Sequence, residues 1–195
     1  GMAFVGAEGK LTGVTLADID GNGLIDLIEA KEGGTQRIVA GADLRSGLLT
    51  RTAGVFGQTM EVDWVASSTF DNVTSSGLHG MPVVLAVASE VRRSDGRGHT
   101  YVESLSYEGG LYEATGFRGF ATVSSTPGAG LRKETDFYRD EKRNGQPREV
   151  RSRDTSGNLR SLSSTETEVV AAELGVEQVL LRTTTTTRYA HDGVT

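Results

Sequence analysis

Nine residues near the N-terminus, DIDGNGLID at positions 18–26, carry the side chains best suited to chemistry in this sequence. We call this segment the acidic loop. Oxygen atoms at alternate positions of a loop bent by glycines converge on one hard cation. The predicted ligands are the side chains of Asp18, Asp20, Asn22 and Asp26 and the backbone carbonyl of Leu24. This set predicts a calcium site; the alternative is a metal-free turn whose carboxylates accept hydrogen bonds from nearby N–H groups.

A second calcium geometry also fits the spacing. Glu29 stands at the twelfth position counted from Asp18, so the segment matches the EF-hand pattern D-x-[DN]-x-[DN]-G-x5-E. An EF-hand has a helix on each side of its loop, and residues 8–15 contain two glycines and three β-branched residues, which form helices poorly. We therefore favour a strand, loop, strand arrangement.

Catalytic motifs of the usual kinds are missing from the sequence. It has no cysteine, which removes thiolate nucleophiles, disulfides and cysteine-based zinc sites. It has no G-x-S-x-G elbow and no phosphate-binding loop, and His79, His99 and His191 are far apart without a serine or aspartate at suggestive spacing. We expect these histidines to lie in turns or at the surface.

Composition narrows the class of protein further. The net charge of −6 gives no basic field for a phosphate backbone, so we expect no nucleic-acid partner. The longest apolar run, residues 81–87, is far shorter than the ~20 residues of a membrane helix, and the N-terminus has no signal-peptide pattern. Glycine is abundant, at 26 of 195 residues, whereas proline occurs only three times, which favours short strands joined by tight turns.

The elements that would position the acidic loop are strands. Residues 58–65 alternate apolar and polar side chains, and residues 94–98 and 144–145 carry turn-forming glycines. The predicted fold is all-β, with antiparallel strands, hairpins and little helix. The predicted strands are residues 58–65, 83–92, 99–107, 117–124, 131–139, 148–154, 159–170 and 179–189.

Only residues 25–31 and 169–174 favour a short helix. Residues 66–80 are polar and predict a mobile loop that marks a boundary. We divide the chain into residues 1–54, which hold the acidic loop and connecting strands, and residues 55–195, an antiparallel β region that could be continuous with the first. Basic and acidic residues interleave over residues 133–160, which predicts a cross-strand charge lattice rather than a nucleic-acid patch.

Residues 14–28, VTLADIDGNGLIDLI, resemble the FG-GAP or VCBS repeat, which joins two strands of a β-propeller blade through a calcium-binding loop. Several later stretches follow in an order similar to the SpvB and insecticidal Tc-toxin B-component family, and residues 189–193 resemble the start of an Rhs shell repeat. The stretches are residues 78–84, 93–101, 106–112, 117–120, 134–140, 145–147 and 153–159.

This resemblance implies a propeller that docks onto a translocation component, followed by a β-shell. It implies a non-catalytic structural and assembly module of a secreted or cell-surface toxin complex, with calcium in the acidic loop. Its partners would be other chains of the complex, or a second copy of this chain paired through strand edges. Because the chain has no signal peptide, we expect it in the cytoplasm before export.

Two other functions are open. One is an independent calcium-dependent extracellular domain that binds carbohydrate or protein. The other is an ADP-ribosyltransferase, because some SpvB-type proteins carry one with an E-x-E motif and Glu166 and Glu168 have that spacing. We favour an exposed strand face for this pair, because a transferase fold needs ~150 residues of its own.

Overall fold

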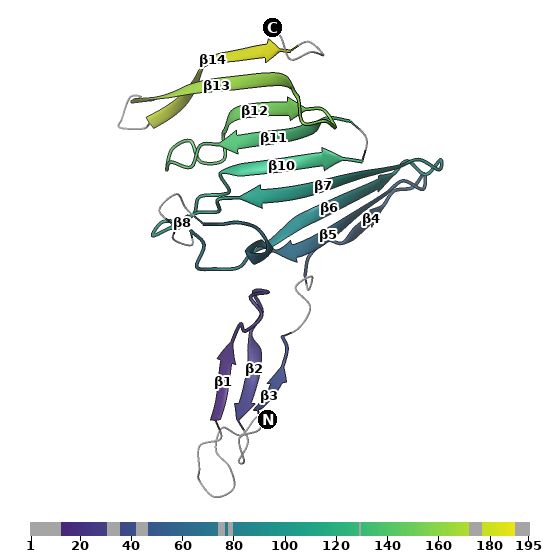
Figure 1. Ribbon diagram of the computed structural model, residues 1–195, viewed down its shortest axis with the longest axis vertical. Helices are drawn as coiled ribbons and strands as arrows, with labels where there is room; N and C mark the ends of the chain where they lie inside the picture. The colour runs from purple at the N-terminus through teal and green to yellow at the C-terminus, as the bar shows by residue number, and fades with distance from the viewer. Residues whose placement is uncertain are drawn as a thin grey trace, which may run out of the picture.

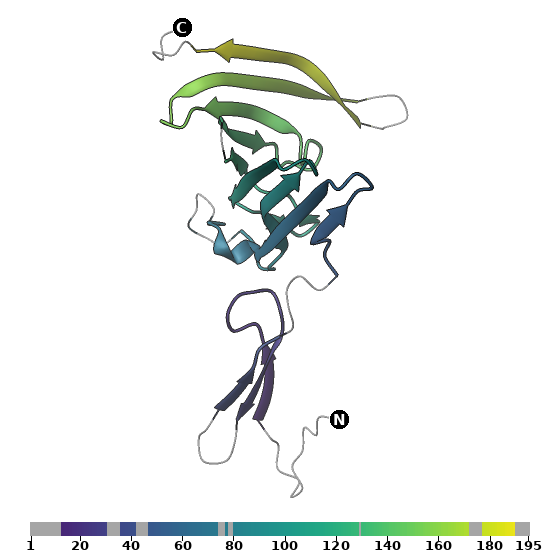
Figure 2. The same ribbon diagram turned by 90° about the vertical axis from the view of Figure 1, so that its right-hand side faces the viewer.

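The structure is a computed structural model of the 195-residue chain that describes residues 13–30, 36–41, 47–73, 77, 80–128, 130–171 and 177–189. In these residues every strand pair is antiparallel, and the helical content is one 3-10 turn, η1 (Ser67–Thr69). The predicted all-β fold is therefore confirmed. Two sheets account for most of the strands, as Figures 1 and 2 show from two directions.

The smaller sheet carries the acidic loop. It has three strands in the order β1 (Gly13–Ala17), β2 (Asp26–Ala30) and β3 (Gln36–Val39). In the β1–β2 hairpin Ala17 lies opposite Asp26, so the acidic loop closes this hairpin. Figure 1 shows the three strands below the larger sheet, with the acidic loop at the end of the hairpin that faces the larger sheet.

The larger sheet has nine strands in the order β14-β13-β12-β11-β10-β7-β6-β5-β4. Almost every strand of this sheet pairs with the strand that precedes or follows it in the sequence. The hairpin turns predicted from glycine positions therefore determine its topology. Its strands are β4 (Arg51–Ala53), β5 (Thr59–Ala66), β6 (Ala86–Ser94), β7 (Thr100–Glu108), β10 (Thr122–Pro127), β11 (Arg132–Phe137), β12 (Pro147–Arg153), β13 (Leu159–Ala171) and β14 (Glu177–Arg188). The short hairpin of β8 (Tyr112–Glu113) and β9 (Gly116–Phe117) interrupts the sequence between β7 and β10.

The described apolar core is small. Ala66, Val87, Val91 and Phe120 are its buried hydrophobic residues. Tyr107 extends this core, because its ring contacts Phe70 and Phe120 at centroid distances of 5.4 and 4.8 Å, and its hydroxyl donates a 2.9 Å hydrogen bond to the carbonyl of Ala88. The core therefore lies where the residues after η1 and after the β8–β9 hairpin meet strands β5, β6 and β7 of the nine-stranded sheet.

Several sequence predictions differ from the structure. The helix predicted at residues 25–31 is wrong for residues 26–30, which are β2, paired on both sides by β1 and β3; Lys31 lies outside the described residues. The helix predicted at residues 169–174 is wrong for residues 169–171, which end β13; the remainder lies outside the described residues. Residues 117–124 are not one strand, because Gly119 takes a positive φ of 83° between β9 and β10.

The segment 66–80 connects two strands of one sheet. β5 and β6 pair with each other, and the segment between them begins with η1 and contains the buried Asn72. β4, which the sequence places in the N-terminal division, pairs with β5 in the larger sheet. The division at residues 54 and 55 stays a prediction.

Candidate metal site

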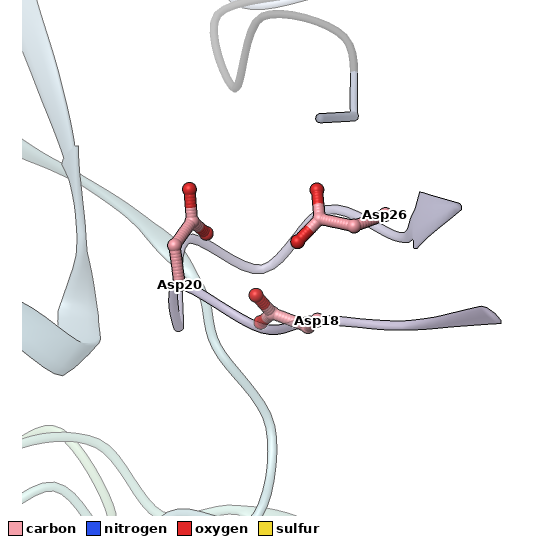
Figure 3. A group of neighbouring side chains, drawn as sticks. All are labelled: Asp18, Asp20 and Asp26. Atoms are coloured by element: carbon pink, nitrogen blue, oxygen red, sulfur yellow. The ribbon is translucent and has the colours of Figure 1, made fainter. Parts of the chain in front are cut away.

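Three carboxylates come together in the acidic loop, which closes the β1–β2 hairpin. Asp18 follows β1, Asp20 lies in the turn, and Asp26 begins β2. One oxygen of each lies within 4.8 Å of one oxygen of each of the others, and Figure 3 shows the three side chains close together at the loop. Calcium binds oxygens at 2.3–2.6 Å, so two ligands of one ion lie up to about 5 Å apart. The cluster therefore has the dimensions of a calcium site.

Backbone geometry holds the loop in this shape. Gly21 and Gly23 have φ values of 74° and 86°, a region that glycine adopts without strain. The turn directs three backbone N–H groups at Asp18: those of Gly21 and Asn22 donate to Oδ1 at 2.9 and 3.1 Å, and that of Gly23 donates to Oδ2 at 2.8 Å. The two glycines thus allow the chain to wrap around the first predicted ligand.

Asp26 is the most enclosed of the three carboxylates, with 2% of its surface exposed. Its Oδ2 accepts from the N–H of Ile19 at 2.9 Å, and its Oδ1 accepts from the N–H of Gly41 at 2.7 Å. The hydrogen bond from Ile19, followed by that from Gly41, lowers the pKa of Asp26 and outweighs the opposing effect of burial. Asp26 is therefore ionised at neutral pH, as a metal ligand must be.

Gly41 is a contributor that the sequence did not indicate. A methyl group on its α-carbon would lie 2.7 Å from Cβ of Leu24 and 2.9 Å from the carbonyl oxygen of Ile25. Only glycine allows the backbone to approach closely enough for the N–H to reach Asp26. Gly41 is one glycine among 26, 15 residues away in sequence, and no local pattern distinguishes it.

The remaining predicted ligands are arranged differently. Asn22 Oδ1 accepts a 2.8 Å hydrogen bond from the N–H of Leu24, and Asn22 Nδ2 donates to Asp20 Oδ2 at 2.8 Å. A carbonyl or carboxylate oxygen has a second lone pair, so these bonds leave room for a cation on the same atoms. Asn22 and the carbonyl of Leu24 stay predicted ligands, whereas Asp18, Asp20 and Asp26 form the cluster that the structure brings together.

Strands flank the acidic loop on both sides, which decides between the two calcium geometries. The EF-hand alternative is wrong, because β1 and β2 stand where its helices would be. Glu29 lies within β2, opposite Val14 of β1. The strand, loop, strand arrangement is confirmed. The many N–H bonds to carboxylates are also those of the metal-free turn, so the geometry fits both alternatives for occupancy.

The other candidate residues lie away from this cluster. His99 is exposed in the β6–β7 turn, where its Nδ1 lies 2.7 Å from Asp95 Oδ2, and His79 and His191 lie outside the described residues. Glu166 and Glu168 lie on β13, and Glu168 forms an ion pair with Arg182 of β14. Glu168 therefore forms a cross-strand ion pair, which agrees with the prediction that this pair of glutamates lies on a strand face.

The predicted charge lattice is present on β11 and β12. Arg151 Nη1 and Nη2 each lie 2.9 Å from an oxygen of Asp136, and Arg151 Nε lies 3.2 Å from Glu134 Oε2. Burial raises the pKa of Asp136, but the hydrogen bonds from Arg151 and Thr122 outweigh it, and the net effect is a lowered pKa. Arg151 of β12 is thus paired with two carboxylates of the neighbouring strand β11.

Comparisons with known proteins agree with this fold. The family model described as "Insecticide toxin TcdB middle/N-terminal region" matches residues 5–147. The chain is similar to a solved structure described as "Crystal Structure of TcdB2-TccC3-TEV", with a TM-score of 0.66 and 14% sequence identity. That similarity covers 90% of this chain and 12% of the other chain. No curated protein matches the sequence. Since the family model spans most of its length, the chain belongs to the insecticide toxin TcdB family and corresponds to its middle/N-terminal region.

Proposed function

We propose that the chain is a non-catalytic structural and assembly module of a secreted toxin complex. The observation that carries this proposal is the nine-stranded sheet, which ends at β4 on one side and β14 on the other with no described strand beyond either. An unpaired strand edge offers a row of N–H and C=O groups to another chain. Membership of the insecticide toxin TcdB family supports this proposal, in which the complex acts outside the producing cell or at its surface.

The edge at β14 is the better suited for assembly. β14 is 12 residues long and pairs with β13 from Glu177 to Arg188, with one register shift at Arg182, so its outer edge is long. Leu180 and Leu181 are 46% and 66% exposed, and five consecutive threonines follow Arg182. An added strand would gain main-chain hydrogen bonds along β14 and cover these leucines. The partner is another chain of a toxin-like complex or a second copy; the similar solved structure carries the names TcdB2 and TccC3 together.

The smaller sheet fits a propeller blade of the FG-GAP or VCBS type. Leu16 and Val39 lie on one face and Ile38 on the other, and all three are exposed. A blade packs between neighbouring blades and covers both faces in this way. In this proposal calcium binds Asp18, Asp20, Asn22, Asp26 and the carbonyl of Leu24, and it stabilises the turn that joins the two strands.

Light scattering after size-exclusion chromatography tests the assembly proposal. We expect the apparent mass of the full chain to rise with concentration, and we expect Leu181→Lys, which places a charge at the β14 edge, to reduce this rise. Val55→Lys is the matched control, because Val55 is 92% exposed in the turn between β4 and β5. A strictly monomeric chain at high concentration would contradict assembly through strand edges.

Calorimetry and thermal unfolding test the calcium proposal. At calcium equal to 100 times its dissociation constant, binding to the native state adds ~2.7 kcal/mol, which raises Tm by roughly 5–11 °C for a chain of this size. EDTA should reverse the rise, and Asp20→Asn should reduce it, whereas Asp71→Asn, outside the acidic loop, should not. An unchanged Tm together with no binding heat would rule out the calcium site. Calcium binding by a strict monomer would favour an independent calcium-dependent binding domain instead.

A further inference from the structure

The acidic loop combines two features. The carboxylates of Asp18, Asp20 and Asp26 form the candidate cation site, and the glycines at the tip, Gly21 and Gly23, contact the larger sheet. We propose that a cation bound in the acidic loop fixes the orientation of the three-stranded sheet relative to the nine-stranded sheet. This inference rests on the proposed calcium function and assigns that site a role as a joint.

The contact is made by the backbone of the two tip glycines. The hydroxyl of Ser68, in η1, donates a hydrogen bond to the carbonyl oxygen of Gly21. The α-carbon of Gly23 lies so close to Val84 that an added methyl group would be 3.0 Å from both Cβ and Cγ1 of that residue. The loop conformation that gathers the carboxylates is therefore the same one that presents Gly21 and Gly23 to the larger sheet.

The surface that receives the tip is well fixed. Ser67, which precedes Ser68, is 1% exposed; its N–H donates to the carbonyl of Leu85 at 2.7 Å, and its Oγ accepts from the N–H of Leu85 at 2.9 Å. Asn72 Nδ2 donates to the carbonyl of Ser67 at 2.8 Å. These bonds anchor η1 to the segment that leads into β6, so the surface that receives the tip is held in place.

Little else in the described residues holds the two sheets together. The chain passes between them once, from β3 to β4, and the extensive contacts of each strand lie within its own sheet. A cavity of about 90 Å³ lies beside the contact, lined by Ser68 and Val84 among others. Orientation therefore depends on a small contact whose geometry follows the conformation of the acidic loop.

Cation binding and docking are coupled for a physical reason. Three carboxylates within 4.8 Å repel one another, and a divalent cation between them converts that repulsion into attraction and holds the loop in one conformation. A loop fixed in that conformation loses less entropy when its tip docks on Ser68 and Val84. Linkage makes the effect reciprocal, so loosening the contact must also weaken cation binding.

Distance measurements between spin labels test the proposal on the full chain. The chain has no cysteine, so Arg37→Cys in β3 and Ser104→Cys in β7 introduce two labels at exposed positions, one in each sheet. With Ca²⁺ we expect one narrow distance distribution, and with EDTA a broader one. Calorimetry on the same samples reports whether Ca²⁺ is bound.

Variants of the contact separate docking from binding. Ser68→Ala and Val84→Ser should lose the Ca²⁺-dependent narrowing, and Ser68→Ala should weaken Ca²⁺ affinity by about two- to tenfold, the equivalent of one hydrogen bond. Ser156→Ala, in the turn between β12 and β13, and Val83→Ser, beside Val84, are the matched controls and should keep both properties.

The outcomes distinguish this inference from the function on which it rests. Bound Ca²⁺ with identical distance distributions in Ca²⁺ and EDTA would overturn the joint and leave the calcium site standing. Narrowing that survives in both Ser68→Ala and Val84→Ser would also overturn it, because the contact would then not transmit the effect. No binding heat with Ca²⁺ would overturn the calcium site and the joint together.

Discussion

Replacing Asn72 with alanine should destabilise the protein, because this side chain makes buried hydrogen bonds to two separate segments. Asn72 is 6% exposed. Its Oδ1 accepts from the N–H of Gly110 at 2.9 Å, and its Nδ2 donates to the carbonyl of Ser67 at 2.8 Å and to that of Phe70 at 3.3 Å. Asn72 thus links η1 to the segment that follows β7.

The expected loss follows from these contacts. The carbonyl of Ser67 also accepts from the N–H of Phe70 at 3.2 Å, so it keeps a partner, whereas the buried N–H of Gly110 loses the acceptor that Asn72 supplies. Two short hydrogen bonds at ~1 kcal/mol each and ~1 kcal/mol for the unsatisfied N–H give a loss of about 3 kcal/mol in the free energy of unfolding. This corresponds to a fall of roughly 6–12 °C in Tm.

Urea unfolding followed through the fluorescence of Trp64, the single tryptophan, measures this loss. Asn144→Ala, at an exposed turn position, is the control and should change stability by less than about 0.5 kcal/mol. Asn72→Asp keeps the acceptor for Gly110 but turns an oxygen toward the carbonyl of Ser67. Folding then raises the pKa of the new carboxyl, so its destabilisation should shrink as pH falls. A loss below about 1 kcal/mol for Asn72→Ala would refute the reasoning.

Two further predictions concern packing and charge. Gly110→Ala should cost ~1–3 kcal/mol in urea unfolding, since its methyl group would lie 2.1 Å from Sδ of Met81, whereas Gly128→Ala, with a nearest contact of 3.6 Å, should cost less. Burial raises the pKa of Asp154, but hydrogen bonds from Asn158 and other groups outweigh it and lower the pKa to about 2. Its stabilising effect is therefore present above pH 3.8 and lost as pH falls toward 2; a carboxyl NMR titration should show this pKa, and Asn158→Ala should raise it.

Local patterns in the sequence predicted the fold where side-chain alternation and glycine turns decide the structure. The strand expected at residues 58–65 is β5, within one residue at each end, because its alternation of apolar and polar side chains has the two-residue period of a strand. Residues 26–30 have helical propensity but pair with strands on both sides, and those hydrogen bonds outweigh a preference of a few tenths of a kcal/mol per residue.

In the candidate site, too, local spacing predicted some residues, whereas contacts between distant segments could not be predicted. Asp18, Asp20 and Asp26 were found because their spacing within nine residues places them on one loop. Ser68 and Val84 contact that loop from 47 and about 60 residues away, and no local pattern records such a contact. The polar composition of residues 66–80 predicts a mobile boundary. In the structure, however, Ser67 and Asn72 are buried, and the Asn72 side chain donates a hydrogen bond to the carbonyl of Ser67.

The small core explains why assembly is a consistent function for this chain. A stable β-domain buries the apolar face of a sheet against a second layer. In the described residues the buried hydrophobic side chains are Ala66, Val87, Val91 and Phe120, which lie on β5 and β6 and just before β10, away from β13 and β14. β13 and β14, by contrast, extend beyond this core, with exposed leucines on β14. The outer strands therefore gain most from a partner, which is why the β14 edge is where a single charged substitution should have its largest effect on assembly.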